Sequence, residues 1–145
     1  MRIAVGSDHG GFELKQCVME HLAKKQIAYE DFGCYSSESV DYPDIAVPVA
    51  KAVLGDDFDL GILICGTGIG ISISANKIKG IRCALCTDTF TAHATREHND
   101  SNILAMGGRV VGPGVAVDIV DTFINASFEG GRHQRRIDKM MALEG

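Results

Sequence analysis

Residues 60–70 read LGILICGTGIG, and this stretch decides the fold class. Its first five residues form an apolar run of the kind found in buried strands of parallel sheets. Glycines then stand at positions 66, 68 and 70, and a helical pattern begins at Ile69. A buried strand that passes through a glycine-rich turn into a helix is typical of α/β folds that bind ligands at this turn.

The same order of strand and helix recurs along the chain. Short β-branched or apolar runs predict strands over residues 2–6, 27–32, 60–64, 81–86 and 102–106. Apolar residues near a 3.6-residue period predict helices over 11–25, 43–54, 69–78 and 89–98. Glycine-containing breaks introduce two further helices, over 115–125 and 132–143. The alternation predicts a three-layer α/β/α, Rossmann-like domain with a five-stranded parallel sheet and a C-terminal helix.

Length and composition exclude several classes of protein. At roughly 150 residues per domain, 145 residues leave room for one domain, which we expect to span 1–145. The 46% of apolar residues can supply one substantial core. Fourteen Lys and Arg against 19 Asp and Glu give a net charge of −5, which disfavours general binding to nucleic acids or to anionic membranes. Any anion that this chain binds therefore needs a local basic site.

The chain carries no apolar run long enough to span a membrane, and Asp8 and His9 interrupt the first residues too early for a signal peptide. The cytoplasm is therefore the expected location. The five cysteines are an odd number, so we expect free thiols. Cys83 and Cys86 resemble a CxxC motif, but their spacing in a strand points the two side chains to opposite faces. We interpret both as core residues.

Polar and glycine-rich segments follow the predicted strands at 7–11, 65–70, 87–88 and 107–109. In parallel sheets covered by helices, ligands bind beyond the carboxyl ends of the strands. The glycine loop after Cys65 directs backbone N–H groups and a helix N-terminus into one small volume, which suits an anion. Helix N-termini also stabilise thiolates, so Cys65 is a candidate base or nucleophile. A buried cysteine beside a tight turn is the structural alternative.

Motif spacing narrows what the glycine loop can be. A cysteine phosphatase needs arginine six positions after the cysteine, where Ile71 stands, and a P-loop needs a lysine that this loop lacks. A dinucleotide fingerprint fits in part, since Gly66 and Gly68 match its first two glycines and Asp88 lies about twenty residues further on. Ile71 stands where that fingerprint needs glycine or alanine. A small nucleotide-binding module stays open as an alternative.

Two further groups of residues could carry chemistry. Residues 98–100 (HND) end a helical segment, where a histidine can also be a structural residue that the helix dipole favours. The sequence gives little support for a metal site, because His93 and His98 are five positions apart and face away from each other on a helix. Arg132 and Arg136 share one helix face, which suits a phosphate or else a solvated basic surface.

Taken together, four motifs resemble type B ribose-5-phosphate isomerase. The matching segments are VGSDHGGF at 5–12, CGTGIG at 65–70, REHND at 96–100 and GGRHQRR at 130–136, and residues 41–44 and 76–77 look similar as well. The resemblance runs from the first strand to the last helix. It implies an aldose–ketose isomerase, free of metal and cofactor, that interconverts D-ribose 5-phosphate and D-ribulose 5-phosphate through an enediolate, a step of the pentose phosphate pathway.

The resemblance also implies a role for each matched residue. Cys65 would be the base that moves the proton between C1 and C2, and His98 would open the furanose ring. The enediolate would be held by backbone N–H groups of the loop Gly66, Thr67, Gly68, Ile69 and Gly70, with Asn99 assisting. The sugar contacts would be Asp8, His9 and Thr67, with His9 near the phosphate, and the phosphate ligands would be Arg109, Arg132 and Arg136.

The family resemblance has two consequences for partners and substrate. The site of this family lies between two subunits, which implies a homodimer or a dimer of dimers with side chains contributed by a neighbouring chain. Related enzymes accept six-carbon phosphates such as allose 6-phosphate or galactose 6-phosphate, so the size of the sugar stays open. The physical chemistry of the residues agrees with the isomerase assignment, because proton abstraction beside a carbonyl needs a base and oxyanion donors, and a phosphate needs an arginine clamp.

Overall fold

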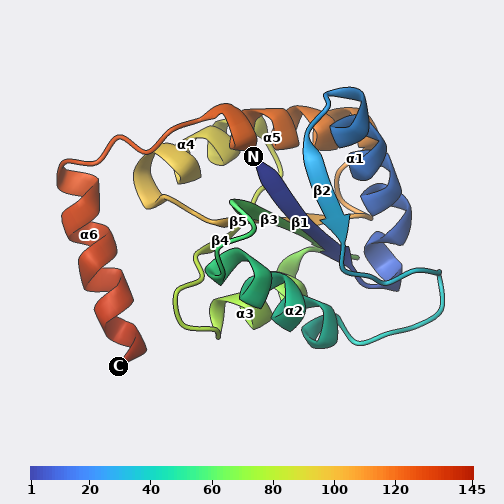
Figure 1. The fold of residues 1–145 in the computed structure, drawn as a ribbon, viewed down its shortest axis with the longest axis horizontal. Coiled ribbons are helices and arrows are strands. Elements are labelled where there is room, and N and C mark those ends of the chain that lie inside the picture. The colour runs from blue at the N-terminus through green and yellow to red at the C-terminus, as the bar shows by residue number, and fades with distance from the viewer.

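Five parallel strands form one sheet at the centre of the molecule (Figure 1). The structure is a computed structural model and describes every residue from Met1 to Gly145. In chain order the strands are β1 (Arg2–Ser7), β2 (Ala28–Asp31), β3 (Leu60–Cys65), β4 (Cys83–Leu85) and β5 (Ile103–Gly107). Their order across the sheet is β2-β1-β3-β5-β4, and every neighbouring pair is parallel. The predicted five-stranded parallel sheet is confirmed.

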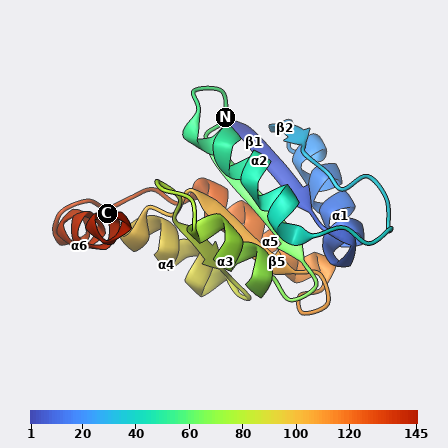
Figure 2. The ribbon, with the colours of Figure 1, turned by 90° about the horizontal axis from the view of Figure 1, so that it is seen from below.

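Helices cover both faces of this sheet. They are α1 (Phe12–Lys24), α2 (Tyr42–Leu54), α3 (Ile69–Asn76), α4 (Thr89–Asn99), α5 (Pro113–Asn125) and α6 (Arg132–Met141), with short 3-10 helices η1 (His9–Gly11) and η2 (Ala142–Glu144). One face is covered by α1, α4 and α5, and the other by α2 and α3 (Figures 1 and 2). The predicted three layers are confirmed. Helix α5 begins two residues earlier than expected, because proline is accepted in a first helical turn.

Two apolar layers, one on each side of the sheet, make up the core. Successive side chains of β3 point to opposite faces, so Ile62 and Ile64 enter the layer beneath α1, α4 and α5. Leu63 and Cys65 enter the layer beneath α2 and α3. Each fully buried side chain of this kind contributes about 1.5–3 kcal/mol to folding. The central strands therefore hold the loops at their carboxyl ends in fixed positions.

The predicted roles of Cys83 and Cys86 as core residues are confirmed. Cys86 is buried in the layer beneath α1, α4 and α5, whereas Cys83 packs against the opposite layer. Burial raises the pKa of both thiols, and the neighbouring Cys86 raises that of Cys83 further. Both groups therefore stay protonated at neutral pH. All five cysteines are free thiols, as expected.

The edge strand β4 is only three residues long, and a side chain closes its outer side. The amide nitrogen of Asn76 donates to the carbonyl oxygen of Cys83 at 2.9 Å. The amide oxygen of Asn76 accepts the backbone N–H of Cys83 at 2.8 Å. One side chain thus satisfies both main-chain groups that would otherwise face outward from this edge.

A fully buried lysine anchors the chain where it leaves β2. The ammonium group of Lys15, on α1, lies 2.7 Å from Oδ1 of Asp31 and also donates to the carbonyl oxygen of Cys34. The side chain of Lys15 has no exposed surface. These contacts hold the start of the segment that connects β2 to α2, and that segment borders the candidate site described below.

Helix α6 lies at one side of the molecule, beyond the end of α4, against which it packs (Figure 1). Only His133 and Ile137 of this helix are buried, and Arg132, Arg135 and Arg136 are exposed. None of the helices combines the length and the apolar character that a membrane crossing requires.

Candidate active site

The carboxyl ends of β1, β3 and β5 lie side by side, and the segments that follow them are joined by backbone hydrogen bonds. The N–H of Asp8 donates to the carbonyl oxygen of Ile64 at 3.2 Å. The N–H of Gly108 donates to the carbonyl oxygen of Cys65 at 2.8 Å, and that of Arg109 donates to the carbonyl oxygen of Gly66 at 2.9 Å. Three segments that are far apart in the sequence thus form one rigid site, which we call the strand-end site.

Cys65 is the last residue of β3, and its sulfur faces the glycine loop. Its side chain is nearly buried, with 4% of the residue exposed. The backbone N–H of Gly68 donates to Sγ at 3.1 Å. A backbone N–H at this distance stabilises negative charge on sulfur. The contact holds the sulfur beside the start of α3.

Gly68 adopts a conformation that makes this contact possible. Its φ of 79° lies in the left-handed region, where glycine has no steric penalty. A Cβ at this position would lie 2.5 Å from Cδ1 of Leu85 and 2.7 Å from the carbonyl carbon of Met106. Both the backbone conformation and the space therefore require glycine here.

The first turn of α3 presents free donors beside the sulfur. The N–H of Ile69 is taken up by Oγ1 of Thr67 at 3.2 Å, and that of Gly68 by the sulfur. The N–H groups of Gly70 and Ile71 have no acceptor within the chain. Unpaired N–H groups at a helix N-terminus can bind an anion or a developing oxyanion.

His9 and Arg109 line a pocket of about 240 Å³ next to the glycine loop. The backbone N–H of Val40 donates to Nδ1 of His9 at 3.2 Å, so Nδ1 is the unprotonated nitrogen of the ring. The remaining nitrogen, Nε2, then carries a proton. Arg109 forms no ion pair with any acidic residue of the chain, and its guanidinium group packs against Gly66. The pocket therefore offers an N–H donor and a guanidinium group without an ion-pair partner, and Glu13 also lines it.

Asp8 is buried between the pocket and the sheet. Its Oδ1 accepts the N–H groups of Gly10 at 2.9 Å and of Gly11 at 3.2 Å, which fixes the turn that carries His9. Its Oδ2 makes no hydrogen bond within the chain and could accept a sugar hydroxyl. The ring of Tyr42 packs against Gly70, where a Cβ would lie 2.6 Å from Cζ. Sequence reasoning assigned no role to Val40 or Tyr42.

The other predicted site residues lie at the opposite edge of the sheet, where the amino ends of the strands are. Helix α4 begins after the carboxyl end of β4 and runs back to the start of β5. Its 11 residues span about 16 Å, so His98 and Asn99, at its end, lie that far from the strand-end edge. Arg132 and Arg136 belong to α6, which packs against α4. One chain therefore brings together only part of the predicted set.

A larger pocket, of about 490 Å³, also lies at this opposite edge. Asn99 stands on its wall with residues of β4 and the C-terminal helix, but His98 and the two arginines of α6 do not line it. It contains neither the candidate base nor a predicted phosphate ligand. The larger pocket therefore does not coincide with the strand-end site.

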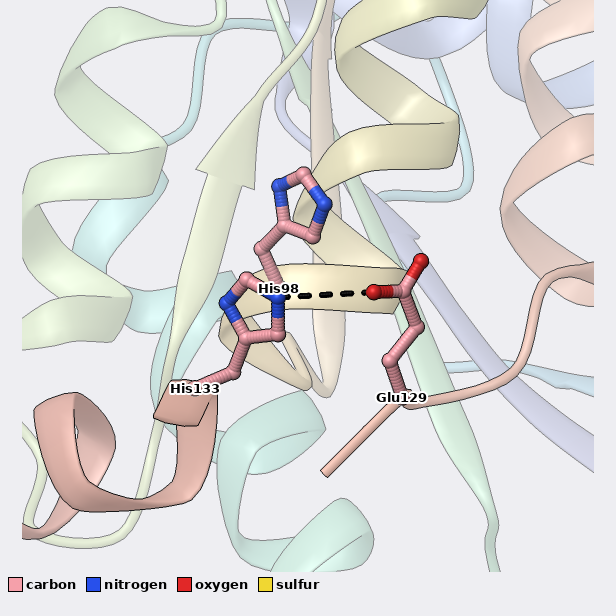
Figure 3. Close-up of side chains that lie close together, drawn as sticks. All are labelled: His98, Glu129 and His133. Atoms are coloured by element: carbon pink, nitrogen blue, oxygen red, sulfur yellow. Dashed lines mark ion pairs between the residues drawn. The ribbon is translucent and has the colours of Figure 1, made fainter. Parts of the chain in front are cut away.

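His98 lies close to two residues, His133 and Glu129, that the sequence did not single out as site residues (Figure 3). Its ring stacks on that of His133, with centroids 4.4 Å apart and planes 13° apart. Nε2 of His133 lies 3.4 Å from Oε2 of Glu129. The four-residue spacing of Glu129 and His133 is the one signal in the sequence that could have indicated this pair.

Asp88, which a dinucleotide site would use to bind a ribose, has a structural role here. It is the N-cap of α4, where its Oδ1 accepts the backbone N–H of Thr91 at 2.7 Å. This hydrogen bond holds the pKa of the Asp88 carboxyl below its usual value. The capping role accounts for this carboxylate without a nucleotide.

Comparisons with known proteins place the chain among sugar phosphate isomerases. Residues 3–140 match the family model of Ribose/Galactose Isomerase. The chain is 50% identical over 143 residues to ribose-5-phosphate isomerase B of Escherichia coli, with 99% of this chain and 96% of the relative covered.

Solved structures of the same family superimpose closely. Ribose-5-phosphate isomerase B of Clostridium thermocellum has a TM-score of 0.98 and 53% sequence identity, over 99% of this chain and 97% of the other. The enzyme from Mycoplasma genitalium, solved with bound ribulose-5-phosphate, has a TM-score of 0.93 and 47% identity, over 99% of this chain and 95% of the other.

Proposed function

This chain belongs to the ribose/galactose isomerase family and is an isomerase, and from that premise we propose that it interconverts D-ribose 5-phosphate and D-ribulose 5-phosphate. The observation that carries the proposal is the strand-end site, where a cysteine, free backbone donors and an unneutralised arginine converge. The relatives named as ribose-5-phosphate isomerase B, one of them with bound ribulose-5-phosphate, favour a five-carbon substrate.

Cys65 is the base in this proposal. Interconversion of an aldose and a ketose moves one proton between C1 and C2, and the carbonyl oxygen becomes negatively charged in the enediolate. A thiolate at Cys65 takes the proton from one carbon and returns it to the other. The N–H of Gly68 supports the sulfur, and the free N–H groups of Gly70 and Ile71 are directed to the oxyanion.

This assignment changes one detail of the sequence-based expectation. Gly68 and Ile69 were both expected to donate to the enediolate, but their N–H groups are occupied by the sulfur and by Thr67. Gly70 stays in the proposed donor set, and Ile71 joins it. Gly66 contributes by its lack of a side chain, because a Cβ there would lie 3.3 Å from the guanidinium group of Arg109.

The phosphate group binds at the pocket lined by His9 and Arg109. Nε2–H of His9 and the guanidinium group of Arg109 supply donors and one positive charge. A phosphate dianion carries two negative charges, and the chain as a whole is acidic, with a net charge of −5. Further positive charge is therefore needed at this pocket.

A second copy of the chain supplies the additional positive charge at the phosphate pocket. The candidate ligands Arg132 and Arg136, together with His98 and Asn99, lie at the opposite edge of the sheet and cannot reach the strand-end site of their own chain. A two-fold dimer brings the opposite edge of one chain to the strand-end site of the other. Exposed apolar side chains of α3 and α4 offer an interface: Ile69 (51% exposed) and Ile73 (53%) on α3, and Phe90 (78%) on α4.

In this dimer the partner subunit's His98 opens the sugar ring. Ribose 5-phosphate is mostly cyclic, and its ring opens when one group takes the proton of the O1 hydroxyl and a proton reaches the ring oxygen. An imidazole changes protonation state near neutral pH and suits both transfers. Asn99 beside it donates to an oxygen of the opened sugar. Asp8 and Thr67 contact the remaining hydroxyl groups.

The deciding experiment compares kcat/KM for ribose 5-phosphate and allose 6-phosphate, with a chelator present and Cys65→Ala as the control. Turnover that depends on Cys65 and prefers ribose 5-phosphate supports the proposal. A preference for the six-carbon sugar would keep the mechanism and change the substrate. Absence of turnover with both sugars, together with saturable nucleotide binding, would overturn it.

A further inference from the structure

We propose that His98, Glu129 and His133 form a binding site for a divalent transition-metal ion of the zinc type (Figure 3). One ligand atom of each residue lies within 4.8 Å of the other two. The site lies at the end of α4, away from the strand-end site of the same chain. A bound ion would occupy a nitrogen of His98 and so inhibit ring opening, a consequence that rests on the proposed function.

The donor set has the chemistry of a zinc site. Two imidazoles and one carboxylate, with a fourth position left to water, are a ligand set that Zn²⁺ accepts in proteins. With metal–ligand bonds of about 2.0–2.2 Å, two ligand atoms of a tetrahedral site lie about 3.4 Å apart. Nε2 of His133 and Oε2 of Glu129 are separated by 3.4 Å. Two of the three ligand atoms are therefore already at the spacing that an ion needs.

The nitrogen of His133 is the second, independent sign of a ligand. His133 is 6% exposed, and its buried Nε2 makes no hydrogen bond, although the carboxylate of Glu129 lies 3.4 Å away as an ion-pair partner. Buried polar atoms nearly always make a hydrogen bond, so a buried nitrogen that has only this longer ion-pair contact points to a further group that binds between the two side chains. Figure 3 shows this nitrogen directed toward the carboxylate of Glu129.

The backbone holds Glu129 in place for this role. Its N–H donates to the carbonyl oxygen of Glu97, in the last turn of α4, at 3.0 Å. The N–H of His133 donates to the carbonyl oxygen of Gly130 at 3.1 Å, which fixes the turn between the two ligands. Two of the ligands thus come from one short, anchored segment, and the third comes from the helix end beneath it.

His98 must turn before it can share an ion with His133. The two rings are nearly parallel, with planes 13° apart, so their nitrogen lone pairs lie in separate planes. His98 is exposed and stands at the helix end, so its ring can rotate about the side-chain bonds, whereas burial holds His133. Metal binding is therefore expected to replace the stacking of the two rings.

The primary test measures binding directly, with Co²⁺ as a spectroscopic probe for the zinc site. The expected result is one ion per chain with the visible spectrum of tetrahedral Co²⁺, and without the near-ultraviolet charge-transfer band that cysteine ligands produce. Glu129→Gln and His133→Asn should each weaken Co²⁺ binding roughly tenfold or more. Because Glu129 is exposed, its substitution tests the site even if His133→Asn fails to fold.

A matched control lies one turn earlier on α4. His93 is exposed and pairs with the half-buried Glu97, with Nε2 of His93 2.8 Å from Oε1 of Glu97, but no second histidine lies beside them. His93→Asn should leave Co²⁺ affinity unchanged. Equal loss in His93→Asn and Glu129→Gln, a charge-transfer band from cysteine, or no binding to the wild-type chain would each overturn the metal site.

The inhibitory effect is tested separately, with Zn²⁺ added to the active enzyme. Zn²⁺ should lower kcat in the wild type, a chelator should restore it, and Glu129→Gln should resist inhibition while keeping its basal rate. Binding of Co²⁺ at the site without inhibition by Zn²⁺ would overturn the inhibitory half alone. If the chain turned over no sugar phosphate, the proposed function would fail, and the Co²⁺ titration would still decide the metal site.

Discussion

The backbone N–H of Gly68 donates to the sulfur of Cys65 at 3.1 Å. This contact joins the end of a buried strand to the first turn of a helix, and it stands next to the free N–H groups of Gly70 and Ile71. In the proposed reaction, neighbouring donors of one loop would stabilise a negative charge on the sulfur and a negative charge on the reacting oxygen.

Replacing Cys65 by alanine should remove the base and leave the binding pocket intact. Because a positioned base contributes about 10²–10⁴-fold, kcat should fall by this factor while KM changes only a few-fold. The measurement is steady-state kinetics with ribose 5-phosphate. Cys17→Ala, on α1 and away from the site, should retain wild-type kcat. A rate for Cys65→Ala close to that of the wild type would assign the base elsewhere.

Gly68→Ala should reduce both stability and activity. A side chain at φ 79° is strained, and its Cβ would lie 2.7 Å from the carbonyl carbon of Met106. We expect a loss of roughly 1–3 kcal/mol in the free energy of unfolding, measured in urea. Gly114→Ala is the matched control, since a Cβ there meets no atom within 4 Å. Equal stability of the two variants would contradict the strain argument.

Cys83 and Cys86 should resist alkylation in the folded protein. The thiolate is the reactive form, and burial raises the pKa of both thiols, so the thiolate fraction near pH 8 is smaller than for a free cysteine. Raising the pH toward the elevated pKa should increase their reactivity. Mass spectrometry after brief treatment with iodoacetamide, with and without urea, measures this protection. Fast labelling of either residue at pH 7 without urea would contradict it.

Two inactive variants should restore activity when they are mixed. If the site takes Cys65 from one chain and Arg136 from the other, a mixed dimer of Cys65→Ala and Arg136→Ala contains one intact site. Random exchange of equal amounts then gives about a quarter of the wild-type specific activity. The measurement is activity after co-refolding of the two variants. Mixing Cys65→Ala with Gly68→Ala is the control, because both changes fall in the same half-site and no intact site can form.

Lys15→Met should destabilise the protein and disturb the pocket around His9. The substitution leaves Asp31 and the carbonyl oxygen of Cys34 without their buried partner. Since Asp31 keeps some contact with solvent, we expect a loss near the lower limit for broken buried pairs, about 3 kcal/mol. Urea denaturation measures it. Lys24→Met, on the exposed side of the same helix, should cost less than about 0.5 kcal/mol.

The alternation of strands and helices could be predicted from the sequence, because the apolar runs and their periods follow from which faces the core buries. The place of Cys65 at a strand end beside a helix start could be predicted for the same reason. The strand order could not be predicted, because the residues of a crossover between parallel strands do not indicate in which direction along the sheet it runs.

The separation of the predicted site residues between the two ends of the sheet is harder to predict from the sequence. The motif at 96–100 stands next to a strand in the chain, yet α4 carries it to the far edge of the sheet. Only the direction of that helix separates His98 from Cys65. The contact of His98 with His133 depends on the course of residues 126–131, which have no periodic pattern and whose path only the structure shows.

The pairing of Asn76 with Cys83 has a consequence for how copies of the chain can meet. An unpaired sheet edge is a template on which further chains add strand by strand, and such growth has no natural end. At this edge the amide of one side chain already occupies both main-chain groups of Cys83, and the strand offers only three residues. Strand addition at the β4 edge is thereby disfavoured, which leaves side-chain contacts between helices for copies that meet on this side.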